Sequence, residues 1–113
     1  MKPTMLLATI LLTATSVAQT GGWSHKADMA APRTNAVAFT IGNKGYIGMG
    51  QDAAGNKLND LWEFNASTLA GTQVWTQKVS LTAGPARSGA VGFELLGLGY
   101  VGTGEDAGGN KLN

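Results

Sequence analysis

The sequence predicts an all-β fold made of repeated antiparallel units. Most of the stretch from Pro32 to Leu61 occurs a second time, and each match lies 54 positions after its counterpart, as Arg87 does after Arg33. Short apolar runs alternate with turns, and the 113 residues include 17 glycines but only 13% charged residues. A repeat of this length that is rich in strand formers indicates a propeller or an array rather than one self-contained fold.

The two copies share an arginine, an aromatic pair, several glycines and a polar loop. The matched positions are Arg33 and Arg87, Phe39 and Phe93, Gly45 and Gly99, Tyr46 and Tyr100, Gly48 and Gly102, Gly50 and Gly104, Asp52 and Asp106, Asn56 and Asn110, and Lys57 and Lys111. The second copy stops at Asn113, one residue before the match to Asp60. We therefore expect the chain to be a fragment of a longer repeat protein.

The first 18 residues have the parts of a secretory signal peptide. Lys2 precedes an apolar run at residues 5–12, and small residues follow at Ser16 and Ala18. The run is shorter than the roughly 20 residues that span a bilayer, so cleavage between Ala18 and Gln19 is favoured over a retained anchor helix. We expect a bacterial protein that is exported to the periplasm, the cell surface or the medium, with no membrane span after cleavage.

The rest of the chain predicts strands in up-and-down order. A lone outer strand is expected at residues 21–26, because the stretch around Trp23 is similar to the one around Trp75. The first unit then has strands at 35–41, 46–50, 59–65 and 74–79, with a turn at 42–45 and a polar loop at 51–58. A second hairpin is expected from strands at 88–95 and 99–103.

The residue patterns of two expected strands predict how their side chains are buried. Residues 35–41 are small or β-branched with little charge, which favours a strand buried on both faces. In the third strand, the alternation of side chains places Leu61 and Glu63 on one face and Trp62 and Phe64 on the other.

These units resemble the kelch repeat of β-propellers, and the exported bacterial kelch proteins in particular, which carry a similar Asp-Leu-Trp-Glu-Phe segment. The resemblance covers the chain after residue 21 and is carried by Arg33, Phe39, Gly45, Tyr46, Gly48, Gly50, Asp60, Trp62, Phe64 and Trp75, with Phe93, Gly99, Tyr100, Gly102 and Gly104 in the second copy. It implies four-stranded antiparallel blades. Signal peptide 1–18 and a lone strand and linker at 19–31 would precede a blade at 32–80 and a partial blade at 81–113.

Composition excludes several classes of function. Without cysteine there is no disulfide, thiolate metal site or cysteine nucleophile. His25 is the single histidine, so neither a zinc site nor a catalytic triad has its partners. The formal net charge is +1, and removal of Lys2 balances the charges, which argues against nucleic acid or an anionic membrane as a partner.

The polar loop raises the possibility of a calcium site. Asp52, Asn56, Asn59 and Asp60 could supply oxygen ligands, but their spacing does not fit the twelve-residue loop in which alternate positions bind. Hydrogen bonds to turn amides are the favoured role of these side chains. We expect neither a metal nor a cofactor.

Arg33 and Arg87 are the candidate ligand-binding residues. The kelch resemblance implies that they begin the innermost strands, where a guanidinium could fork onto a carboxylate of a peptide or an acidic sugar. The alternative is that each arginine bridges loop carbonyls or a carboxylate such as Asp52 or Asp106. Recurrence at one repeat position favours the structural role, because a ligand rarely contacts every unit alike.

Two functions follow from the resemblance. The first is a binding or scaffolding module for a protein or glycan ligand, non-catalytic by itself and completed by further blades of a longer parent chain. The alternative is a fragment of a carbohydrate-active propeller enzyme, of the epimerase type, whose active site lies in other blades. In either case we expect an incomplete propeller that aggregates, self-associates or melts with weak cooperativity, because repeat units commonly need about three copies for stability.

Export is directly testable. N-terminal sequencing of the protein secreted by a bacterial host is expected to begin at Gln19, because the signal peptidase requires the small residues at Ser16 and Ala18. A soluble cytoplasmic product that retains Met1 would contradict the assignment.

Overall fold

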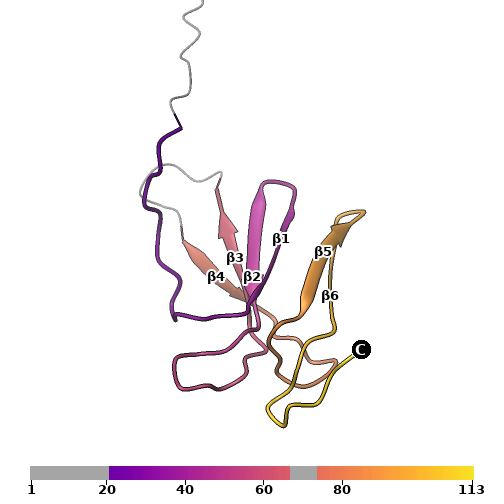
Figure 1. Cartoon of the computed structure of the whole chain (residues 1–113). Helices are drawn as coiled ribbons and strands as arrows, with labels where there is room; N and C mark the ends of the chain where they lie inside the picture. Colours follow the sequence, from indigo (N-terminus) through magenta and orange to yellow (C-terminus); the bar gives the residue numbers. More distant parts are fainter. Residues whose placement is uncertain (1–20, 67–73) are drawn as a thin grey trace, which may run out of the picture.

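The computed structural model describes residues 21–66 and 74–113, which form two antiparallel sheets (Figure 1). The first sheet has strands β1 (Val37–Ile41), β2 (Lys44–Gly48), β3 (Leu61–Asn65) and β4 (Trp75–Lys78) in the order β1-β2-β3-β4. The second has β5 (Val91–Leu95) and β6 (Leu98–Gly102). The predicted all-β, up-and-down arrangement is confirmed for these residues, whereas the predicted signal helix lies outside them.

The described part contains no helix that is long and apolar enough to cross a membrane.

Both sheets contain a hairpin with a two-residue turn. The first turn begins with Gly42 at φ 58°, and the second is formed by Leu96 and Gly97 at φ 54° and 79°. Positive φ at these positions matches the right-handed twist of paired strands. The predicted turn at 42–45 is therefore too long, because Lys44 already pairs with Ile41.

The register of the first sheet gives it two different faces. Val37 and Phe39 pair with Gly48 and Tyr46, and Tyr46 pairs in turn with Glu63. The inner face, which carries these side chains, is turned toward β5 and β6. The outer face carries Ala38, Thr40, Gly45, Ile47, Trp62, Phe64 and Trp75. Leu61 and Glu63 thus share a face opposite to Trp62 and Phe64, as the alternation predicts.

The second sheet packs on the inner face through glycine. A Cβ atom added to Gly92 would lie 2.1 Å from Cγ2 of Val37, and one added to Gly99 would lie 2.4 Å from Cε2 of Phe39. Any side chain at these two positions would push the sheets apart. Val37 is consequently buried, with 3% of its surface exposed.

The outer face is uncovered along β1, and this corrects one prediction. Strand β1 is not buried on both sides: Val37 is buried, but Ala38 and Thr40 are exposed. The composition of a strand records which faces are apolar, but not whether a neighbour is present to cover them.

The predicted strand around Trp23 is also absent. Residues 21–29 form no regular structure, and Trp23 is fully exposed. The segment is held near the first sheet by another contact, in which Trp75 Nε1 donates a hydrogen bond to the carbonyl of Ala27 over 2.9 Å. A strand needs a continuous backbone partner, and none of the described strands pairs with this segment.

A buried carboxylate joins three strands of the first sheet. Glu63 accepts a hydrogen bond from the Tyr46 hydroxyl at 2.8 Å and pairs with the ammonium groups of Lys44 and Lys78 at 3.1 and 3.0 Å. These contacts, led by the hydrogen bond from Tyr46, lower the pKa of Glu63 from 4.5 to about 2. Burial, together with the same hydrogen bond, raises the pKa of Tyr46.

Acid titration tests this cluster. Because the pKa of Glu63 is lower in the folded state, its ionised form stabilises the fold above about pH 4.5, and this contribution is lost as the pH falls toward about 2. Glu63→Gln should lower the melting temperature at neutral pH and flatten its decline across that window. Glu94→Gln, at an exposed carboxylate of the second sheet, is the matched control. Parallel acid profiles for wild type and Glu63→Gln would contradict the assignment.

Candidate binding cleft

The polar loops of the two repeats lie at the same end of the sheets, opposite the hairpin turns (Figure 1). Asp52 Oδ1 accepts hydrogen bonds from the amides of Ala54 and Asn56, both at 2.9 Å. Asp106 Oδ1 does the same with the amides of Gly108 and Asn110, also at 2.9 Å. Hydrogen bonds from each loop asparagine are the largest influence lowering the pKa of Asp52 and of Asp106.

Positive backbone angles shape these loops identically in the two copies. The matched residues are Asn35 and Gly89 (φ 52° and 66°), Met49 and Thr103 (54° and 62°), Gly50 and Gly104 (90° and 96°), and Gly55 and Gly109 (91° and 80°). Gly50 also permits close approach, because a Cβ there would lie 2.5 Å from the Thr34 carbonyl oxygen. Met49 adopts this conformation while it is 98% buried, so its side chain fills the core between the repeats.

Arg33 is held by the first sheet. Its guanidinium donates to Oδ1 and Oδ2 of Asp60 at 2.7 and 2.9 Å, and also to the Met49 carbonyl at 3.1 Å. Only 5% of the side chain is exposed. Trp62 Nε1 donates to the same carboxylate at 2.7 Å. Arg33, followed by Trp62, lowers the pKa of Asp60.

Arg87 is equally buried but bonded differently. It donates to the carbonyls of Thr103 at 3.0 Å and Pro85 at 3.4 Å. The contact with Thr103 repeats that of Arg33 with Met49, but no carboxylate pairs with Arg87 among the residues that the structure describes. The repeat match to Asp60 would be the residue after Asn113.

The hydrogen-bond partners of both arginines lie within the chain. The fork of Arg33 is already occupied, and neither arginine points into open solvent. The carboxylate that binds Arg33 is Asp60, not Asp52 as the sequence suggested, since Asp52 closes its own loop. Gly48 lies beside this pair, and a Cβ there would be 2.4 Å from the Asp60 carbonyl oxygen.

The remaining aromatic residues and the histidine lie outside the loops. Phe64 and Trp75 pack on the outer face with ring centroids 5.1 Å apart. His25 is exposed and contacts Asp28 at 3.0 Å. Within the described ranges, no three His, Asp or Glu side chains gather in a way that would hold a metal ion.

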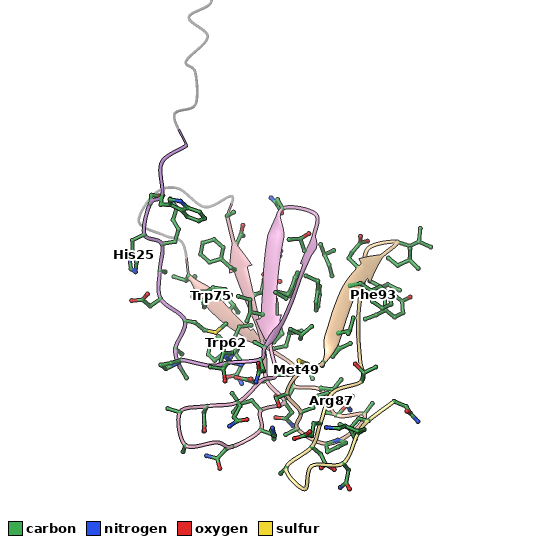
Figure 2. The ribbon with its side chains drawn as sticks, in the orientation of Figure 1. His25, Met49, Trp62, Trp75, Arg87 and Phe93 are labelled. Atoms are coloured by element: carbon green, nitrogen blue, oxygen red, sulfur yellow. The ribbon has the colours of Figure 1, made fainter. Side chains whose placement is uncertain are left out.

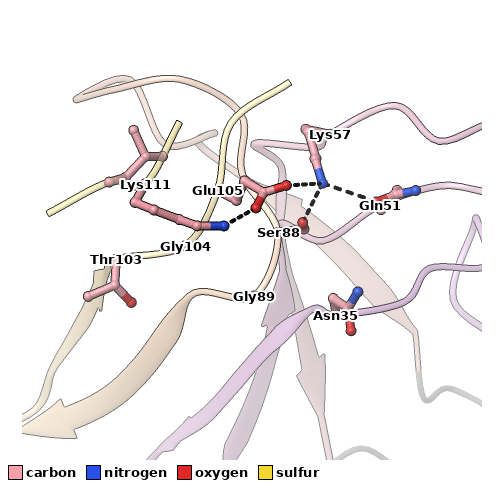
Figure 3. Close-up of a pocket in the computed structure, with 10 residues that line it drawn as sticks. Asn35, Gln51, Lys57, Ser88, Gly89, Thr103, Gly104, Glu105 and Lys111 are labelled. Atoms are coloured by element: carbon pink, nitrogen blue, oxygen red, sulfur yellow. Dashed lines mark hydrogen bonds and ion pairs between the residues drawn. The ribbon is translucent and has the colours of Figure 1, made fainter. Parts of the chain in front are cut away.

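A polar cleft of about 660 Å³ opens where the two repeats meet at the loop end (Figure 3). Its lining consists of Asn35, Gln51, Lys57, Ser88, Gly89, Thr103, Gly104, Glu105, Lys111 and Leu112. Backbone hydrogen bonds fix its walls: Gly89 donates to the Asn35 carbonyl at 2.9 Å, and Gly50 donates to the Arg87 carbonyl at 2.8 Å.

Lys57 crosses the cleft from the first repeat to the second. Its ammonium donates to Ser88 Oγ at 2.7 Å and to Gln51 Oε1 at 3.1 Å, and 13% of the side chain is exposed. Glu105 Oε1 lies 3.9 Å from the same nitrogen, too far for a hydrogen bond. Glu105 is therefore an ion-pair partner of Lys57, and a ligand would meet this ammonium group beside that carboxylate.

Two ammonium groups and one carboxylate give the cleft a net positive charge. Lys111, which is exposed, pairs with Glu105, and this hydrogen bond is the main cause that lowers the pKa of Glu105. Hydroxyl and amide groups of Ser88, Thr103 and Asn35 add neutral hydrogen-bonding capacity. The arrangement suits a polar ligand that carries an anionic group.

The sequence did not single out this cleft. Lys57 and Lys111 are matched repeat positions without a predicted role, and the change from Gln51 to Glu105, one of two differences between the loops, was the signal that could have been used. The link between Lys57 and Ser88 spans 31 positions and depends on how the repeats pack.

No protein-family model matches the chain, and a search of curated proteins gives no significant relative.

The arginine assignment predicts a stability effect. Arg33→Ala is expected to lower the free energy of unfolding by about 1–3 kcal/mol, because Asp60 and the Met49 carbonyl lose their donors. Arg33→Lys, which keeps the charge but not the fork, should lie between that variant and wild type. Denaturant unfolding at one fixed protein concentration measures both, with the exposed Lys26→Ala as control. Unchanged stability with loss of ligand binding would instead indicate a ligand-binding arginine.

Proposed function

We propose that this chain is an exported kelch-type propeller module that binds a protein or glycan ligand and is not an enzyme by itself. The sequence repeat and the signal-like N-terminus support this proposal. The four-stranded sheet, with the hairpin of a second unit packed on its inner face, has the arrangement expected of adjoining propeller blades. Further blades, supplied by a longer chain or by other copies of this one, would complete the propeller.

The polar cleft is the observation that carries the binding role. It is formed by both repeats, is large enough for a monosaccharide or a few peptide side chains, and carries two ammonium groups against one carboxylate. An anionic group, such as the carboxylate of an acidic sugar or of an acidic peptide, would bind Lys57 from the open side of the cleft.

Ligand titration tests this role. An isotope-labelled chain is titrated with N-acetylneuraminic acid and, separately, with a short glutamate-rich peptide, while amide shifts are followed by NMR. We expect shifts at Ser88, Gly89 and Gly104 with one of these probes. Lys57→Met should weaken the binding of that probe about 10-fold or more, because a charge-assisted hydrogen bond is lost.

Lys26→Met removes an exposed lysine outside the cleft and should leave binding unchanged. Shifts that avoid the cleft, or equal binding by wild type and Lys57→Met, would refute the proposed site. Chemical conversion of the sugar during the titration would favour the alternative of a carbohydrate-active enzyme.

A further inference from the structure

The second sheet presents a row of uncovered apolar side chains. Val91, Phe93, Leu95, Leu98 and Tyr100 are 59, 52, 53, 60 and 42% exposed. They form the free face of β5 and β6, which is turned away from the first sheet, and Phe93 marks it in Figure 2. A contiguous apolar patch of this kind on a small protein indicates a surface that is covered by another molecule.

The same chain shows how such a face is covered. The free face is the repeat counterpart of the inner face of the first sheet, with Phe93 in the place of Phe39. Phe93 and Tyr100 stack at 5.2 Å and 11°, as Phe39 and Tyr46 do at 5.4 Å and 12°. Within the chain, the Phe39 ring of the first pair is covered by the flat backbone at Gly92 and Gly99.

A matching surface, with open space beside Gly45, is present on the outer face of the first sheet. Ala38 and Gly45 are the repeat counterparts of Gly92 and Gly99. A Cβ on Gly45 would meet nothing within 4 Å, whereas one on Gly99 would strike the Phe39 ring. Around Gly45 lies a cavity of about 400 Å³, lined on this face by Thr40, Ile47, Phe64 and Trp75.

We propose that the free face of one chain binds the outer face of the first sheet in a second copy of this chain, with Phe93 seated over Gly45. The contact repeats, between molecules, the packing of Phe39 over Gly99 within one molecule. None of the side chains of the outer face around Gly45 is charged, which suits an aromatic partner.

One difference separates the two interfaces. Ala38 carries a methyl group where Gly92 has none, and within the chain this space is taken by Val37. The counterpart of Val37 is Val91, which is mostly exposed and free to change rotamer. The sheets of two copies would therefore lie slightly farther apart than those of one chain.

The proposed contact is head-to-tail. Each chain keeps one free face and one outer face after binding, so further copies add until the rotation between copies closes a ring. This inference is independent of the cleft, which lies at the loop end and uses other residues.

Site-specific cross-linking provides the test, because the natural chain has no cysteine. Chains with Phe93→Cys are mixed with chains with Gly45→Cys and treated with a short bis-maleimide. We expect a cross-linked heterodimer in the mixture and little product from either variant alone. Val79→Cys, at an exposed position on neither surface, replaces Phe93→Cys in the control and should give no product with Gly45→Cys.

Sedimentation of uncross-linked protein gives the second measurement. Wild type should sediment as oligomers at micromolar concentration. The variants Phe93→Lys and Gly45→Leu should each sediment as monomers. Neither change removes a contact between the two sheets of one chain, because Phe93 lies on the free face, where it stacks only on Tyr100 of its own sheet, and Gly45 has open space beside it. A wild type that stays monomeric, or cross-linking of Phe93→Cys with itself, would overturn the proposal and assign the free face to a different occupant.

Discussion

The contact between the Phe39 ring and the bare backbone at Gly92 and Gly99 holds the two repeats together. It sets the distance between the sheets, since any side chain at either glycine would overlap with Phe39 or Val37. Burial of Val37 and Met49 depends on that distance. Hydrophobic burial is non-directional and does not by itself fix how one sheet is positioned along the other. The backbone hydrogen bonds from Gly50 to Arg87 and from Gly89 to Asn35 fix that position.

The cleft at the loop end is a consequence of the same packing. Each loop folds by itself around an aspartate, Asp52 or Asp106, and neither loop alone encloses a cleft. The cleft exists because the packed sheets bring Lys57 of one repeat to Ser88 of the next. The cleft and the interface are thus linked: a change that moves the sheets apart also separates these two side chains.

Local features could be predicted from the sequence, and long-range partners could not. Strands and turns followed from short apolar runs and from glycine and asparagine positions, so all six strands were anticipated with small errors at their ends. The partner of Arg33 was missed because Asp60 is 27 positions away and reaches it only through the register of β2 and β3. The strand at Trp23 and the two-sided burial of β1 were wrong, since both require a neighbour that the composition of a segment does not reveal.

The bridge made by Lys57 has a consequence for how such a chain can evolve by duplication. A repeat whose loop bonds only to itself can be copied, deleted or shuffled freely, but the Lys57 loop carries a hydrogen bond that is completed by the following unit. A recombination that replaced the second repeat would have to keep a hydroxyl at the position of Ser88, as its repeat counterpart Thr34 would, or leave the mostly buried ammonium group without that partner. A substitution at Ser88 therefore also changes the surroundings of Lys57 in the repeat before it, and the two copies behave as one unit at this point.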